Sequence, residues 1–221
     1  MSGKRKVVFA EGEVYHVFNR ATANEQIFVK KKDLERALDL FSFYRFKQSL
    51  RFSFFKRLTD QEKDEHIKNL SNKAPIVDIY AYSLMPNHFH LLLRENSSKG
   101  VQTFLSNFQN SFAKFFNIKN NRFGTLFQRP FKAKHIDTDG ELLHVSRYIH
   151  LNPVTAYIIE YDELKGSNLS SLPSYLDKKE TFISNEFLIK LVGSAARYER
   201  FVANQIDYQR KLAKIRHLLL D

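Results

Sequence analysis

Apolar and polar positions along the chain follow two alternating patterns. Short runs rich in β-branched, aromatic and other apolar residues are typical of strands, and apolar residues repeated every three or four positions are typical of helices. The order strand, helix, two adjacent strands, helix, strand, helix predicts an α+β fold with an antiparallel sheet, a split β-α-β arrangement with helices on one face. The predicted strands are residues 13–19, 76–84, 88–95 and 131–136, and the first two predicted helices are residues 32–47 and 101–117.

Phenylalanines dominate the second predicted helix. Phe104, Phe108, Phe112 and Phe115 are spaced by four, four and three positions. This spacing places them on one face, so we expect a core stripe.

A third helix follows the last predicted strand. Thr138 and Glu141 have the spacing of a capping box, which predicts a helix start. Tyr148 and Asn152 are four positions apart, so they share one face of this helix at roughly 5–6 Å between Cβ atoms. Pro153 disfavours helical geometry at the residue before it. The helix is therefore predicted to end at Asn152.

The chain divides into a main domain and an extension. Residues 1–165 are predicted to form one domain, with an insertion around residues 48–74. Basic residues alternate with phenylalanines at 51–57; this pattern fits stacking on single-stranded nucleic acid, but core packing is the favoured interpretation. Residues 166–221 are predicted to be a Ser-rich connector and a basic helical extension. Its apolar stripe indicates either a helix packed on the main domain or an accessory DNA-binding or dimer-forming helix; the stripe is Tyr198, Phe201, Gln205, Tyr208, Leu212, Ile215 and Leu219.

Charge and composition narrow the class of partner. The 221 residues include 35 Lys and Arg against 24 Asp and Glu, a net charge of +11, which favours a polyanion such as nucleic acid. The absence of cysteine excludes disulfides and thiolate metal sites and suits a reducing cytoplasm. No apolar run approaches the ~18 residues of a membrane span, and the N-terminal apolar run is too short for a signal peptide. We therefore expect a cytoplasmic protein that does not bind membranes.

A His-x-His pair is the main candidate for chemistry. In a strand, His88 and His90 point to one face and Phe89 to the other. Two imidazoles on one face can share a divalent metal; the alternative is one structural and one exposed histidine. His16 lies in the first predicted strand, where packing is favoured over a role in a site.

Two stretches together resemble the single-tyrosine HUH transposases, in particular the REP-associated tyrosine transposases (transposase IS200-like domain). They are Met-Pro-Asn-His-Phe-His-Leu-Leu-Leu at 85–93 and Arg-Tyr-Ile-His-Leu-Asn-Pro-Val at 147–154. Smaller matches are Tyr-His-Val-Phe-Asn-Arg at 15–20 and Gly-Thr-Leu-Phe-Gln-Arg at 124–129. The resemblance covers about residues 10–175 and implies a ferredoxin-like sheet that carries the histidine pair centrally.

The resemblance also implies a reaction. Tyr148 would be the nucleophile that cuts DNA through a 5′-phosphotyrosine. His88 and His90 would bind Mg²⁺ or Mn²⁺, with Asn152 either a third ligand or only a helix cap. The expected partner is single-stranded or hairpin DNA, with a homodimer possible. The residues expected to contact DNA are Arg20, Lys114, Lys119, Arg122, Gln128, Arg129, Lys132 and Lys134.

Other functions fit the sequence less well. A two-histidine phosphoesterase needs two His-x-Thr or His-x-Ser motifs, and the sequence has only one, at 144–146. A zinc hydrolase of the His-Glu-x-x-His type needs that motif on a helix, and the sequence lacks it. A non-catalytic or domesticated protein that binds hairpin repeats is the alternative from another class.

Overall fold

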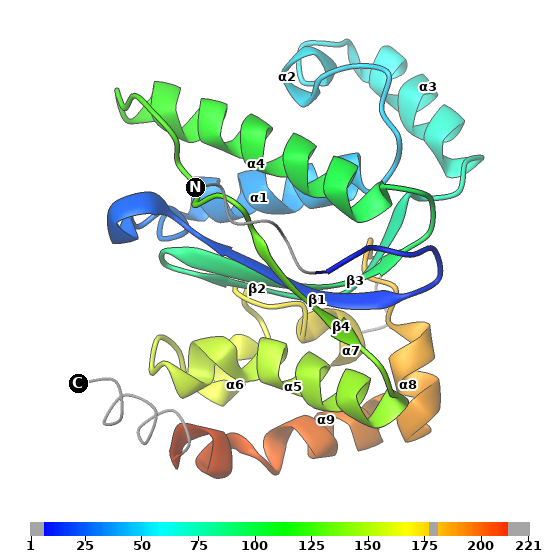
Figure 1. The fold of residues 1–221 in the computed structure, drawn as a ribbon, viewed down its shortest axis with the longest axis vertical. Helices are drawn as coiled ribbons and strands as arrows, with labels where there is room; N and C mark the ends of the chain where they lie inside the picture. The colour runs from blue at the N-terminus through cyan, green and yellow to red at the C-terminus, as the bar shows by residue number, and fades with distance from the viewer. Residues whose placement is uncertain (1–6, 177–180, 212–221) are drawn as a thin grey trace.

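A four-stranded antiparallel sheet forms the centre of the molecule (Figure 1). The computed structural model describes residues 7–176 and 181–211. The sheet has the order β2-β3-β1-β4, and all three neighbouring pairs are antiparallel. This topology confirms the predicted α+β fold class and its split β-α-β arrangement. The strands are β1 (Val14–Arg20), β2 (Val77–Met85), β3 (His88–Glu95) and β4 (Lys132–Ile136).

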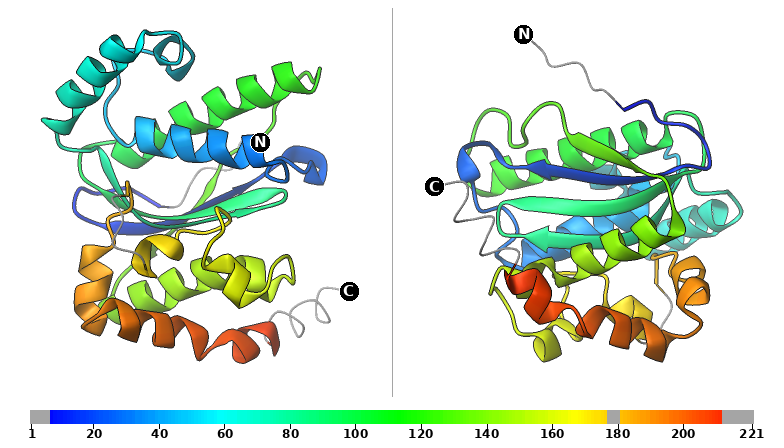
Figure 2. Two further views of the ribbon diagram at one scale, coloured as in Figure 1. Left: turned by 180° about the vertical axis from the view of Figure 1, so that it is seen from behind. Right: turned by 60° about the horizontal axis from the view of Figure 1, so that its bottom comes forward.

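Helices cover both faces of the sheet (Figures 1 and 2). The two crossover helices, α1 (Lys31–Tyr44) and α4 (Gly100–Lys119), pack together on one face, whereas α5 (Asp139–Thr155) lies against β2 and β3 on the other. The prediction of helices on one face is therefore correct only for the crossover helices. The physical reason is that β2 and β3 are buried on both sides, so each face needs a covering layer.

The remaining helices of the described chain are shorter than α1, α4 and α5. The structure contains η1 (Thr22–Asn24), α2 (Phe52–Phe55), α3 (Asp60–Ser71), α6 (Tyr161–Leu164), α7 (Pro173–Leu176), α8 (Glu186–Val192) and α9 (Ala195–Ala203). None of the helices in the described parts of the chain combines the length and the apolar composition of a membrane span.

The phenylalanine stripe of α4 is largely as predicted. Phe104, Phe108 and Phe112 are fully buried, but Phe116 completes the stripe in place of Phe115. The helix runs regularly to Lys119, so position 116 stays on the buried face. The ring of Phe115 instead lies 4.5 Å beneath the guanidinium of Arg36.

Two phenylalanines of the segment between α1 and β2 pack against α1. Phe52 is buried, and its ring lies 5.2 Å from that of Phe43 on α1. Phe55 also lies against Phe43, at 5.0 Å. Core packing therefore explains these two side chains, whereas Phe54 is exposed.

The Ser-rich connector covers the β2 edge of the sheet. The backbone N–H of Leu84 donates to the carbonyl of Leu169 at 2.8 Å, and the N–H of Ser171 donates to the carbonyl of Tyr82 at 3.1 Å. These bonds satisfy backbone groups that an open edge would leave unpaired.

The C-terminal part is helical, as predicted, but in separate pieces. Gly193 adopts a φ of 98° between α8 and α9, and a turn at residues 204–205 precedes a further helical stretch at 206–211. Tyr198 of the predicted stripe is buried. Leu212, Ile215 and Leu219 lie outside the described residues.

Gly100 offers a test of this packing. A Cβ at this position would lie 2.2 Å from the backbone oxygen of Ile76, whereas a Cβ at Gly140 would have its nearest neighbour at 3.9 Å. We expect Gly100→Ala to lower the free energy of unfolding by about 1–3 kcal/mol. Gly140→Ala should be neutral or stabilising by up to about 1 kcal/mol. Urea denaturation followed by circular dichroism measures both. Equal stability of Gly100→Ala and the wild type would contradict the close approach of α4 to the backbone of Ile76, directly before β2.

Candidate active site

Two histidines project from the start of β3 toward the α5 face. His88 and His90 share this face because alternate residues of a strand point the same way. Phe89 points to the opposite face, where its ring lies 5.3 Å from that of Phe108 on α4. The predicted tight turn joins them to β2, which ends at Met85.

A third histidine joins the pair from β1. Strand pairing places Phe18 opposite His90 and His16 opposite Leu92. The His16 ring reaches back so that its Nε2 lies 2.9 Å from Nδ1 of His90. The prediction that His16 is only a packed strand residue missed this contact, because the contact depends on which strands are neighbours.

In both β3 histidines, Nδ1 is the ring nitrogen that makes a hydrogen bond. Nδ1 of His88 lies 2.6 Å from the side-chain oxygen of Asn87. Because an amide oxygen only accepts, His88 donates through Nδ1 and keeps a lone pair on Nε2. If His90 donates through Nδ1 to His16, it likewise keeps a lone pair on Nε2. Both rings can then act as ligands through the same atom.

Burial keeps these histidines neutral. It lowers the pKa of His16 to about 4 and of His88 to about 4, and the pKa of His90 falls well below its usual value. The nearby charges of Lys134 and Arg20 act in the same direction. At neutral pH the three rings therefore carry no charge, and each keeps one nitrogen lone pair that can accept a hydrogen bond or bind a metal.

Helix α5 carries Tyr148 to this group. The Oγ1 of Thr138 accepts from the backbone N–H of Glu141 at 3.1 Å, so the predicted N-cap is present. The Glu141 carboxylate accepts from the N–H of Asp137 at 3.1 Å, one residue before the expected partner. The Tyr148 ring lies 5.7 Å from the His90 ring at nearly a right angle and 6.1 Å from the His16 ring.

The predicted helix end at Asn152 is wrong. Helix α5 continues through Pro153 to Thr155. The carbonyl of Asn152 accepts from the N–H of Ala156 at 3.0 Å and from Oγ1 of Thr155 at 3.1 Å. Val154 and Thr155 are buried, and this burial offsets the hydrogen bond that the proline removes. Asn152 is thus a helix-interior residue, not a C-cap.

A cavity of about 480 Å³ lies between the start of β3 and helix α5. His88, Tyr148 and Asn152 line it, together with Gln205, Tyr208 and Gln209 from the C-terminal part. Of the ten tyrosines, Tyr148 and Tyr208 are the two that line this cavity. The local sequence could not predict that these C-terminal residues line the cavity, because their position depends on packing between helices that are distant in sequence.

A buried polar group ties α5 to the C-terminal part. Nε2 of His150 lies 2.9 Å from Oγ of Ser171, and its Nδ1 lies 3.2 Å from the Tyr198 hydroxyl. That hydroxyl also donates to Oγ of Ser146 at 2.8 Å. The predicted site did not include His150. In the structure His150 belongs to this buried polar group, on the side of α5 away from Tyr148.

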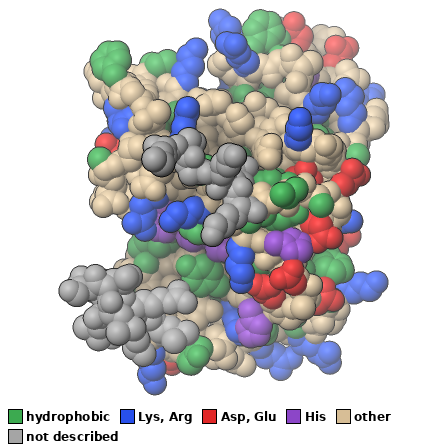
Figure 3. Space-filling model, viewed as in Figure 1, with side chains coloured by type: hydrophobic (Ala, Val, Ile, Leu, Met, Phe, Trp, Pro, Cys, Tyr) green, Lys and Arg blue, Asp and Glu red, His purple; other side chains and the backbone are tan. Residues whose placement is uncertain are grey.

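Three of the predicted DNA contacts lie on the histidine face. Arg20 on β1 and Lys132 and Lys134 on β4 are exposed. The Lys132 ammonium lies 5.9 Å from the centre of the Phe18 ring, and Lys134 pairs with Glu141. Figure 3 shows histidines exposed in the middle band of the molecule, with Lys and Arg side chains beside them.

Three further predicted contacts lie elsewhere. Lys114 is exposed on α4, on the other side of the sheet. Gln128 and Arg129 are exposed and line a groove of about 850 Å³ between α4 and the loop that precedes β4.

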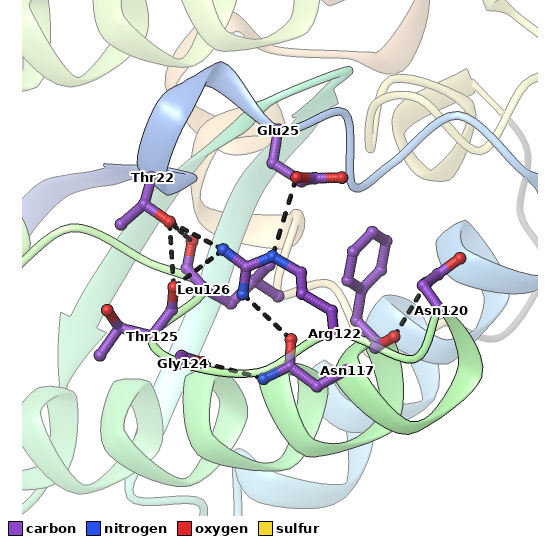
Figure 4. Close-up of polar contacts among 9 residues, drawn as sticks. Thr22, Glu25, Asn117, Asn120, Arg122, Gly124, Thr125 and Leu126 are labelled. Atoms are coloured by element: carbon purple, nitrogen blue, oxygen red, sulfur yellow. Dashed lines mark hydrogen bonds and ion pairs between the residues drawn. The ribbon is translucent and has the colours of Figure 1, made fainter.

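Lys119 and Arg122 are engaged within the protein. Lys119 pairs with the buried carboxylate of Asp33. The Arg122 guanidinium donates to Asn117, Thr22 and the carbonyl of Thr125, each at 3.1 Å, and lies 3.7 Å from Glu25 (Figure 4). The structure therefore gives both residues a role in fixing the loop after α4.

The imidazoles of His88 and His90 are the two side chains at this site that could bind a metal. Across the described residues, no three His, Cys, Asp or Glu side chains are arranged to hold a metal ion. A third protein ligand would have to be a different group, such as the Asn152 amide. Its nitrogen has one long contact, 3.5 Å to Oγ of Ser83.

Comparisons with known proteins point to one family. Residues 46–152 match the family model described as "Transposase IS200 like". The structure is similar to that of a REP-associated tyrosine transposase bound to a REP hairpin, with 13% identity, a TM-score of 0.51, and coverage of 82% of this chain and 90% of that chain. A candidate transposase from Deinococcus radiodurans R1 aligns over 67% of this chain and 95% of its own, with 15% identity and a TM-score of 0.36. No curated protein matches.

Proposed function

We propose that this chain, whose residues 46–152 match the model of the IS200-like transposase family, cuts and rejoins single-stranded or hairpin DNA with Tyr148 as nucleophile. The observation that carries the proposal is the position of this tyrosine. Its ring lies 5.7 Å from that of His90, in the cavity that His88 also lines. The side chain is half-buried, so part of it remains accessible to a phosphate.

The reaction exchanges one phosphodiester for another. The Tyr148 oxygen bonds to phosphorus, and the bond from phosphorus to the 3′ oxygen breaks. The phenol loses its proton and the 3′ oxygen gains one. The products are a 5′-phosphotyrosine and a free 3′-OH, and attack by that hydroxyl restores the strand. No external energy source is needed because the ester is conserved.

The donor set fits a divalent metal, Mg²⁺ or Mn²⁺. Nε2 of His88 and Nε2 of His90 are the proposed ligands, with the Asn152 side-chain oxygen as a candidate third. Such an ion would neutralise phosphate oxygens and orient the scissile bond. Imidazole ligands favour Mn²⁺.

His16 is a positioning residue in this proposal. By accepting from Nδ1 of His90, it selects the tautomer that leaves Nε2 of His90 free. Partners of this kind orient metal-binding histidines in many proteins. The positive charge of Lys134, opposite His16 in the sheet, helps to keep His16 neutral and able to accept.

Basic side chains on the same face would hold the DNA backbone. Arg20 and Lys132 are exposed beside the histidines, and Phe18 offers a ring near Lys132. A strand tracked by charge and stacking fits this arrangement. Hairpin DNA as substrate, and the REP-associated branch, are supported by the sequence motifs and by the similar fold. Tyr148 and the histidines come from one chain, so the proposed homodimer is not required to assemble the site.

The first test removes one hydroxyl. Tyr148→Phe should preserve fold and DNA affinity but lower strand cleavage by on the order of 10³-fold or more. Covalent protein–DNA adducts should disappear from denaturing gels. Tyr157→Phe, which alters an exposed tyrosine outside the cavity, is the control. Wild-type adduct levels in Tyr148→Phe would refute the assignment. If the wild type binds hairpins but forms no adduct under any metal condition, the protein is a binding module.

A second test concerns the metal. His88→Ala and His90→Ala should abolish Mn²⁺ binding, measured as the loss of bound Mn²⁺ in electron paramagnetic resonance titrations. His16→Ala should weaken it by about 10–100-fold. His16→Gln, which retains an acceptor, should restore most of the affinity. His135→Ala, on the opposite face of the sheet, is the matched control.

The pH dependence of binding follows from the low pKa values. A free histidine is mostly protonated at pH 5.5, whereas burial holds the pKa of His88 and His16 at about 4. We expect Mn²⁺ affinity to change little between pH 7.5 and pH 5.5. Equal Mn²⁺ affinity of the wild type and His88→Ala would rule out this metal site.

A third test separates surface charge from loop anchoring. Each phosphate contact on single-stranded DNA contributes about −0.7 to the slope of log affinity against log salt. The double substitution of Arg20 and Lys132 by alanine should flatten the slope by about 1.4. Arg122→Ala should lower the melting temperature and leave the slope nearly unchanged, because its charge already faces Glu25. If Arg122→Ala flattens the slope and the double variant does not, the DNA follows the loop after α4 instead.

A further inference from the structure

In addition to the Tyr198 hydroxyl, two arginines attach the C-terminal part to α5. The Arg147 guanidinium donates to the carbonyl of Phe201 at 3.4 Å and lies 4.2 Å from its ring centre. Further along, Arg210 donates to the carbonyl of Val154 at 3.4 Å and pairs with Glu160 at 3.0 Å. The residues between these points, 202–209, are therefore held against the helix that carries Tyr148.

This attachment places three side chains in the wall of the proposed active site. Gln205, Tyr208 and Gln209 line the same cavity as His88 and Tyr148. Tyr208 is 59% exposed, so most of its ring is available for contact. The side-chain oxygen of Gln209 is buried, and none of the described residues donates to it. If the Gln209 amide rotates toward the cavity, a ligand that carries a hydrogen-bond donor can satisfy this oxygen.

The side chains of Gln205, Tyr208 and Gln209 favour one class of ligand. An aromatic ring offers a face for stacking, and two primary amides each offer a donor and an acceptor. No Asp or Glu is present among the described residues that line the cavity, so a phosphate-linked ligand meets no negative charge there. The ligand that combines a planar ring, hydrogen-bonding edges and a phosphate is an unpaired nucleotide of a nucleic-acid strand.

We propose that Tyr208, Gln205 and Gln209 form a subsite for one unpaired nucleobase of the strand being cut. The base stacks on Tyr208, and the two amides contact its edge. The proposal rests on the proposed function for the presence of single-stranded DNA in the cavity, but not on the identity of the nucleophile. It gives the C-terminal part a direct role in holding the substrate.

Photo-crosslinking tests the subsite without a known target sequence. The probe is a random single-stranded DNA pool that carries 5-iodouracil, which crosslinks efficiently to stacked aromatic side chains. The protein is the full-length Tyr148→Phe variant, so that phosphotyrosine adducts do not interfere. Mass spectrometry should locate a crosslink at Tyr208. Crosslinks at other residues but not at Tyr208 would overturn the subsite while leaving DNA binding intact. No crosslinks at all would overturn both the subsite and the proposed DNA partner.

Affinity measurements distinguish stacking from packing. In the same background, Tyr208→Ala should weaken single-strand binding by roughly 5- to 100-fold. Tyr208→Trp and Tyr208→Phe should retain binding, and Tyr208→Leu, which keeps apolar volume without a ring, should not. Phe187→Ala, a partly exposed aromatic on α8, is the control and should bind as the parent does. If Tyr208→Leu binds as tightly as the parent, the side chain only packs. If Tyr208→Ala binds more tightly, residues 205–209 obstruct the cavity, and the subsite is refuted.

Discussion

The antiparallel pairing of β1 with β3 fixes the positions of all three histidines. In this register His90 lies opposite Phe18, and His16 reaches the Nδ1 atom of His90. Because side chains alternate along a strand, a slip of one residue would turn His88 and His90 toward the phenylalanine core. Phe89 packed against α4 prevents that slip, since the same shift would expose it on the α5 face. The aromatic core on one side of the sheet thus holds the histidines on the other.

Electrostatics and burial act together at this face. Burial keeps the histidines neutral, and Arg20 and Lys134 reinforce that effect while adding positive charge outside the rings. Neutral ring nitrogens suit a metal, because it does not have to displace a proton from them, and the surrounding cations suit a polyanion. The basic residues divide by role. Arg20 and Lys132 face the histidine side, whereas Lys119 and Arg122 are occupied in loop contacts. Total charge therefore overstates the number of side chains free to bind phosphate.

Local sequence predicted the sheet well and the site in part. Strands and crossover helices depend on short-range periodicity, so their bounds were close, and the spacing of His88 and His90 determined their common face. The errors arose where long-range packing decides. Burial of Val154 and Thr155 carries α5 past Pro153, although the proline alone predicts a stop. His16 and Tyr208 reach the site only through strand pairing and through helices that are distant in sequence. No local pattern could have indicated either approach.

The central claim is that Tyr148 is the tyrosine that attacks DNA. Tyr208 lines the same cavity and is therefore the competing candidate. The most direct measurement is peptide mapping of the covalent adduct. Wild-type protein would be allowed to cleave single-stranded hairpin DNA with Mn²⁺ and quenched. It would then be digested with protease and nuclease and sequenced by tandem mass spectrometry. The account predicts a nucleotide on the peptide that contains Tyr148 and an unmodified Tyr208 peptide. A nucleotide on Tyr208, or on any tyrosine outside the cavity, would contradict it.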